Sequence, residues 1–104
     1  MNNESGETPE KTEFSLFRSP SLFTKIYATN SLLTRTDSDF RIELFNEKFQ
    51  TEDGWVYQSD GSVILTREAA KKLLIMLDNE IKAYEKESGE IKISEERMKF
   101  QYLI

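Results

Sequence analysis

Two pairs of acidic residues are the strongest catalytic candidates in the chain, but neither pair is arranged as a catalytic set. Asp37 and Asp39 flank a serine and are typical of a turn, where their side chains bond the local backbone. Glu95 and Glu96 are adjacent, so on a helix their carboxylates point in different directions. The chain contains no His and no Cys, which are the usual general bases, nucleophiles and zinc ligands. We therefore predict no catalytic residue, no metal site and no cofactor, and we expect a protein that is not an enzyme.

The basic and aromatic residues give a weaker case for nucleic-acid binding. Nineteen acids against 14 bases leave a formal charge of -5, which repels a phosphate backbone unless the bases cluster. Trp55 and Tyr57 could stack on bases, but no basic residues flank them. A nucleic-acid surface would need a basic face assembled from scattered residues, namely Lys25, Arg35, Arg41, Lys71 and Lys72. Nucleic acid is therefore an unlikely partner and remains an alternative only.

Apolar residues outside the regular patterns are the best candidates for protein contact. Ser15-Leu16-Phe17 recurs as Ser21-Leu22-Phe23, and either interpretation is open: two pieces that cover an edge of the core, which we favour, or a docking peptide. The apolar run 98–104 must find cover on its own core, a sister subunit or a partner. The predicted partner-binding residues are Leu16, Phe17, Leu22, Phe23, Met76, Phe100, Tyr102 and Leu103.

The first half of the chain reads as strands. Residues 24–36 are expected to form a strand in which Ile26, Ala28, Asn30 and Leu32 share one face. A turn at 37–39 leads into residues 40–44, where Phe40, Ile42 and Leu44 alternate with Arg41 and Glu43 and are expected to face inward. The two segments should form an antiparallel hairpin.

A second hairpin is predicted from turn signals. Residues 51–54 form a turn, and Asp60-Gly61 favours a tight connection between strands at 55–58 and 62–65. The alternative is one continuous strand with a bulge at Gly61.

The helix is the best defined element. Thr66 is a good N-cap, Glu68 lies in the first turn, and Gly89 ends the helix. A single stripe collects most of the apolar residues, with steps of three and four: Ala70, Leu73, Leu74, Leu77, Ile81 and Tyr84. Met76 and Ala83 widen the apolar surface and indicate a second contact.

These elements predict one α+β domain, an antiparallel sheet of about four strands followed by one long helix packed on one face. Residues 1–13 are expected to be a disordered tail, 14–91 the domain and 92–104 an apolar C-terminal extension, with a short strand at 90–93 and a last helical turn capped by Ser94. Neither a secretory signal nor a membrane span is recognisable, so the expected compartment is the cytoplasm.

Three stretches of the chain resemble a family of short bacterial and archaeal proteins of unknown function, numbered three-four-six-seven among such domains. They are Tyr27-Ala28-Thr29-Asn30, the strand 39–45, and the strand, cap and helix that run from Ile64 through Thr66, residues 70–74 and 84–85 to Ile91. The resemblance implies the strands-then-helix fold and no known activity. The same order of elements is similar to a shortened SecB-like export-chaperone subunit at the level of the fold alone.

The favoured function is a small binding or adaptor domain that forms homo-oligomers and contacts other proteins. The alternatives are a nucleic-acid-associated regulator and a SecB-like binder of unfolded segments. The first interpretation rests on apolar residues that need a partner surface.

Overall fold

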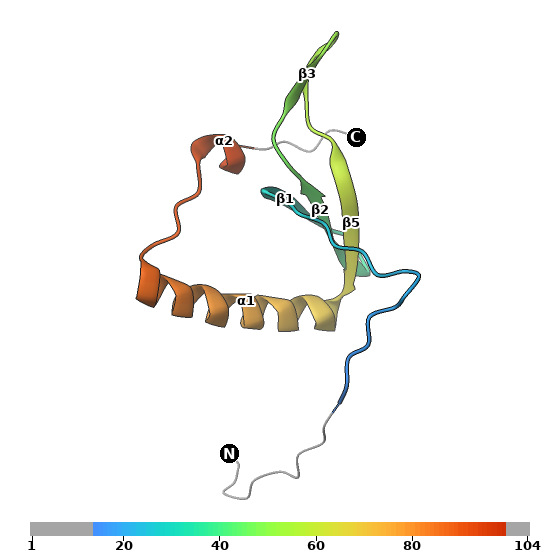
Figure 1. Ribbon diagram of the computed structural model, residues 1–104, viewed down its shortest axis with the longest axis vertical. Helices are drawn as coiled ribbons and strands as arrows, with labels where there is room; N and C mark the ends of the chain where they lie inside the picture. Colours follow the sequence, from blue (N-terminus) through green and yellow to red (C-terminus); the bar gives the residue numbers. More distant parts are fainter. Residues whose placement is uncertain (1–13, 100–104) are drawn as a thin grey trace, which may run out of the picture.

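The computed structural model describes residues 14–99, so the predicted tail at 1–13 and the end of the predicted extension at 100–104 lie outside the described residues. Figure 1 shows an antiparallel sheet followed by one long helix, which confirms the predicted α+β class. The elements are β1 (Asn30–Arg35), β2 (Asp39–Phe45), β3 (Phe49–Thr51), β4 (Gly54–Val56), β5 (Ser59–Thr66), α1 (Arg67–Ser88) and α2 (Glu95–Met98).

The main sheet has three strands in the order β1-β2-β5, with both pairs antiparallel. Leu33 lies opposite Ile42, which lies opposite Val63, so these side chains share one face. Thr34 and Arg41 lie opposite each other on the other face. The predicted β1-β2 hairpin and the alternation of Phe40 and Ile42 with Arg41 are confirmed, and the more apolar face is the one that α1 approaches. The inner face predicted for Asn30 and Leu32 was wrong, because the register places both on the face opposite α1.

The strand predicted over residues 24–36 was too long, because β1 begins only at Asn30. Its partner β2 ends at Phe45. The side chain of Asn46 then forms hydrogen bonds with the backbone that precedes β1. Asn46 Oδ1 accepts a hydrogen bond from the Thr29 amide at 3.0 Å, and Asn46 Nδ2 donates to the Tyr27 carbonyl at 3.0 Å. One amide side chain thus satisfies backbone groups that a ladder would otherwise pair.

The predicted pairing of residues 55–58 with 62–65 was wrong. The alternative, one continuous strand with a bulge at Gly61, agrees better with the structure. β5 runs through Gly61 as one strand and pairs with β2. Leu44 lies opposite Gly61 and Phe45 opposite Ser59, so Asp60 is the extra residue of a bulge. The predicted turn at 51–54 is confirmed, and it joins β3 to β4.

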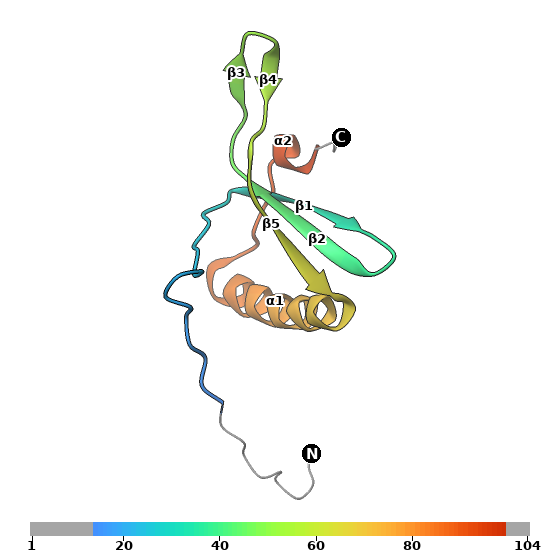
Figure 2. The same cartoon turned by 90° about the vertical axis from the view of Figure 1, so that its right-hand side faces the viewer.

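The β3-β4 hairpin projects beyond the sheet as an arm (Figure 2). Its turn is closed by Thr51, whose hydroxyl accepts from the Asp53 amide at 3.2 Å and donates to the Gly54 carbonyl at 3.0 Å. Lys48 Nζ lies 5.4 Å from the centre of the Trp55 ring, a cation–π contact at the surface of the arm.

The helix boundaries agree with their predicted caps. Thr66 Oγ1 accepts from the Ala69 amide at 3.2 Å, and Gly89 takes a φ of 95° while its amide donates to the Glu85 carbonyl. Ser94 caps α2 as predicted, through a hydrogen bond from the Arg97 amide. The short strand predicted at 90–93 is not formed, since these residues are coil.

The core is small. Among residues 14–99, Phe45 is the only hydrophobic side chain that is buried, with 2% of its surface exposed. Its ring meets that of Tyr57 edge to face, with centroids 5.4 Å apart. No residue of α1, all of which is described, is buried, although α1 packs against β5 and β2. The helix therefore covers the sheet face only in part.

Gly61 provides a first test of the packing. A Cβ atom at this position would lie 2.5 Å from Ile26 Cδ1, so any larger residue requires the end of the Ile26 side chain to move. We expect Gly61→Val to lower the free energy of unfolding by about 1 kcal/mol in urea denaturation, because Ile26 must leave its present rotamer to make room.

A matched control lies next along the strand. Ser62→Thr, on the opposite and exposed face, keeps the hydroxyl that bonds Glu43 and should change the free energy of unfolding by less than about 1 kcal/mol. Adding Ile26→Ala to Gly61→Val should recover part of the loss, and no recovery would contradict this contact.

Candidate protein-binding surface

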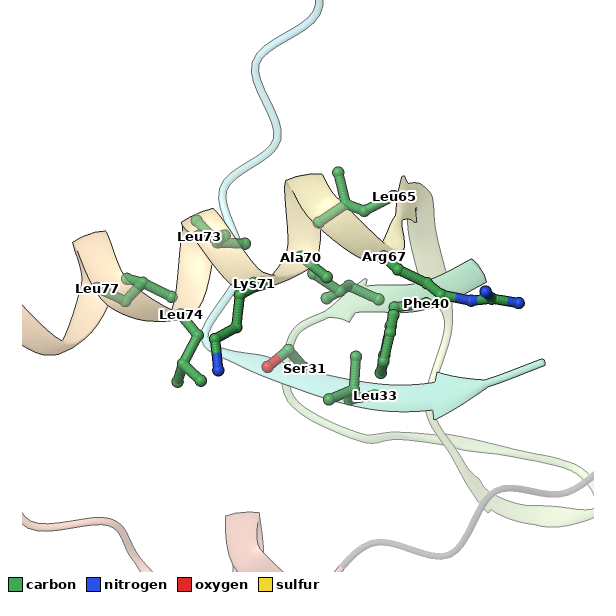
Figure 3. Close-up of a pocket in the computed structure, with 11 residues that line it drawn as sticks. Ser31, Leu33, Phe40, Leu65, Arg67, Ala70, Lys71, Leu73, Leu74 and Leu77 are labelled. Atoms are coloured by element: carbon green, nitrogen blue, oxygen red, sulfur yellow. The ribbon is translucent and has the colours of Figure 1, made fainter. Parts of the chain in front are cut away.

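An open cavity of about 580 Å³ lies between the first half of α1 and the sheet (Figure 3). It arises because the helix leaves β5 at a sharp cap and then runs across the sheet face. Strand side chains form one wall and helix side chains the other. The lining residues are Ser31, Leu33, Phe40, Ile42, Leu65, Arg67, Ala70, Lys71, Leu73, Leu74 and Leu77.

The cavity offers apolar contact and very little polar chemistry. Arg67 is already engaged, because its guanidinium donates to the carbonyl oxygen of Asp37. Ser31 and Lys71 are the other polar side chains of the lining. A small-molecule site usually adds several convergent polar groups to an apolar lining. This cavity is better suited to apolar side chains from another protein surface.

The apolar stripe of α1 continues beyond the cavity. Figure 1 shows the second half of the helix extending past the edge of the sheet. Ile81 and Tyr84 lie on this half and expose 42% and 55% of their surface, while Leu33 and Leu74 at the cavity expose 62% and 60%. We call these four residues together with Leu77 the α1 surface.

The sequence-predicted contact residues are placed elsewhere or outside the described residues. Leu16, Phe17 and Leu22 are exposed in the segment before β1. Arg18 and Lys25 each lie over the Phe23 ring, at 5.1 and 5.9 Å from its centre. The stretch that carries the Ser-Leu-Phe repeat therefore does not cover a core edge with its leucines.

Met76 is exposed on α1, but its position in the helical period places it well away from the stripe. Phe100, Tyr102 and Leu103 lie outside the described residues. Sequence reasoning found the helical stripe and the inward positions of Phe40 and Ile42, but it missed the β1 part of the cavity wall, because Leu33 was not assigned to the inner face.

The candidate cations for nucleic acid are divided between the two faces of the sheet. Arg41 points to the face opposite α1, where its Nε lies 3.0 Å from Asp39 Oδ1. Arg35 shares the other face with Phe40, and Lys71 lines the cavity there. Lys25 lies over the Phe23 ring. The structure does not bring these residues together as one basic patch.

A polar cluster ties α2 to the sheet and was not foreseen. Glu47 Oε2 accepts from Thr29 Oγ1 at 2.8 Å and from Arg97 at 2.6 Å. Asn30 Nδ2 donates to the Arg97 carbonyl at 3.4 Å, and Lys48 pairs with Glu96 at 3.1 Å. Partners separated by 50 residues leave no periodic signal in a sequence, which explains why this cluster was missed.

Acid should weaken this cluster. The hydrogen bond from Thr29, and then the one from Arg97, hold the pKa of Glu47 below its ordinary value of 4.5. A carboxylate whose folded pKa is depressed stabilises the fold above the unfolded pKa and loses that contribution as pH falls through the folded one. We expect urea midpoints to fall on acidification below about pH 4.5, and Glu47→Gln to reduce that dependence.

Glu52→Gln is the matched control variant, because Glu52 lies in the β3-β4 turn and its side chain makes no hydrogen bond with another residue of 14–99. Like Glu47→Gln it removes one carboxylate, but it breaks no contact between α2 and the sheet. An identical acid response in the wild type and Glu47→Gln would show that the contacts of Glu47 are not formed in solution.

Residues 14–99 hold no group of three or more acidic side chains placed to bind a metal ion. Within the same range, neither helix combines the length and the apolar character needed to cross a membrane.

Comparison with known proteins gives one result. The profile of a family described as "Protein of unknown function (DUF3467)" matches residues 1–93, whereas no curated protein and no solved structure matches the chain. The family resemblance seen in the strands and helix is thereby confirmed, and nothing supports the likeness to SecB-like subunits. Because the match spans most of the chain, the chain belongs to the DUF3467 family of proteins of unknown function.

Proposed function

We propose that this protein is a small, non-enzymatic cytoplasmic binding domain that self-associates and acts as an adaptor through protein–protein contact. The observation that carries the proposal is the exposed α1 surface in a fold whose only buried hydrophobic side chain among residues 14–99 is Phe45. A monomeric domain rarely leaves so much contiguous apolar surface in water unless a partner covers it.

The energetics favour cover by another protein. Burying the exposed half of one large apolar side chain gains about 1 kcal/mol. The α1 surface has five such side chains, so a symmetric pair gains on the order of 10 kcal/mol before the cost of association is subtracted. Self-association therefore adds stability that the small core does not provide.

Light scattering coupled to size-exclusion chromatography tests the proposal over a wide range of protein concentration. A dimer or larger oligomer whose thermal midpoint rises with concentration is the expected result. A protein that stays monomeric at high concentration, with melting independent of concentration, would contradict self-association.

A further inference from the structure

The apolar residues of α1 carry a regular pattern that the sheet does not use. Ala70, Leu74, Leu77, Ile81 and Tyr84 follow one another at alternating steps of four and three. This heptad spacing is typical of a helix that packs along another helix. In the chain itself only the first part of this row lines the cavity, and Ile81 and Tyr84 lie beyond it.

We propose that the second helix is α1 of another copy, packed antiparallel along this row. The inference rests on the proposed self-association and names its surface. An antiparallel pair related by a two-fold axis places the distal half of each helix, which has no sheet beneath it, over the proximal half of the other (Figure 1). Tyr84 of the second copy then faces Leu74 and fills the cavity, while Ile81 of the second copy packs on Leu77.

The flanking charges agree with this direction. Lys71, Asp78 and Glu85 are spaced by seven residues and occupy one flank of the row. In the antiparallel register Lys71 meets Glu85 of the second copy, twice by symmetry. Asp78 approaches Asp78 of the second copy, but each Asp78 is already paired with Lys82 of its own chain at 2.8 Å. Among the described residues Lys71 takes part in no ion pair. Glu85 Oε2 accepts a hydrogen bond from the Ile91 amide at 3.0 Å, which leaves its other carboxylate oxygen for Lys71 of the second copy.

A parallel pair is disfavoured on two grounds. It would bring Glu80 beside Glu85 of the other copy at both flanks, which places like charges together. It would also place the two sheets at the same end of the helix pair, where they would crowd each other. The distal half of each helix would then contact only the distal half of the other. In the antiparallel pair Glu80 also approaches its symmetry mate, but two attractive contacts between Lys71 and Glu85 accompany it, and the parallel pair has no such contact.

Single cysteines report the register, because the chain has no Cys of its own. Asp78→Cys places two thiols near the two-fold axis, so a short bis-maleimide should link two copies efficiently. Glu85→Cys is the matched control at the same flank, and its two thiols would be about 20 Å apart along the axis. Glu85→Cys mixed with Lys71→Cys should again give a linked pair.

Charge reversal provides an independent measurement on intact, unlinked protein. Lys71→Glu should weaken self-association roughly tenfold, because two attractive contacts become repulsive. Lys71→Glu combined with Glu85→Lys should restore it to near the wild-type value.

The outcomes separate this inference from the proposed function. Equal linking of Asp78→Cys and Glu85→Cys would show a parallel pair and overturn the inference. No linking of either variant, in a wild type that is oligomeric by light scattering, would also overturn it and leave self-association standing on another surface. A monomeric wild type would end both proposals.

Discussion

Replacing Phe45 with alanine should lower the free energy of unfolding by about 3–5 kcal/mol, the largest loss expected from any single side chain in the sheet. Phe45 is 2% exposed and packs edge to face on Tyr57, at the place where the sheet gives way to the arm. Truncation leaves a cavity that the strands cannot close, since the register there is fixed by the bulge at Asp60. A small domain has a total stability of roughly 5–15 kcal/mol, so the variant should be partly unfolded at room temperature.

Chemical denaturation followed by circular dichroism measures this effect. Phe49→Ala is the matched control, because Phe49 is a phenylalanine on the neighbouring strand β3 but is exposed. It should cost less than about 1 kcal/mol. Phe45→Leu should retain most of the stability, because it keeps an apolar side chain of similar size. Equal losses for Phe45→Ala and Phe49→Ala would show that the core lies elsewhere.

Ile81→Lys should weaken self-association by at least roughly a hundredfold, or about 3 kcal/mol, because it removes two apolar contacts at a symmetric interface and buries two charges there. Ile81 lies outside the cavity and has no role in the core, so the fold should be retained. Lysine is the suitable replacement, since Asp78 and Glu85 flank the position at helical spacing and support it in the free helix.

The control replaces an isoleucine of comparable exposure on the opposite face of the sheet. Ile64 is 57% exposed and lies opposite Arg41, so Ile64→Glu introduces a charge beside an opposite one. Its dissociation constant by analytical ultracentrifugation should match the wild type. An equal change of the dissociation constant in the two variants would show that self-association is non-specific hydrophobic association. An unchanged dissociation constant in Ile81→Lys would show that the α1 surface is not part of the interface.

The helix was predictable because its signals are local. Thr66, Glu68 and Gly89 act on backbone groups within four residues, and the apolar stripe needs no knowledge of its partner. The β1-β2 hairpin was predictable for the same reason, since alternation and a short turn determine the pairing. In that turn, however, it is the Thr36 hydroxyl that accepts from the Ser38 and Asp39 amides.

The errors in the predicted strands arise from contacts between residues that are far apart in the sequence. Asp60-Gly61 favours a tight turn locally, but Asp60 accepts a hydrogen bond from Asn46 Nδ2, and Gly61 leaves space for Ile26. Both partners lie more than a dozen residues away, and they hold the segment extended. The same Asn46 side chain bonds the backbone of Tyr27 and Thr29, so the ladder between β1 and β2 does not extend to residues 24–29. The alternation of side chains alone could not reveal this.

The binding surface was predictable on its helical side and, for Phe40 and Ile42, on its sheet side. The row on α1 was recognised from spacing, whereas the sheet wall depends on which face of β1 turns towards the helix. Leu33 was missed because the inner face was assigned from Asn30 and Leu32, which the register places on the opposite side.

The position of Trp55 has a practical consequence for spectroscopy. The chain has a single tryptophan, and it lies exposed on the β3-β4 arm under the ammonium group of Lys48. Its fluorescence emission will therefore report the local state of that hairpin and the pairing of β3 with β4. Folding studies that rely on this fluorophore alone will follow the arm, while the melting of α1 needs a far-ultraviolet signal.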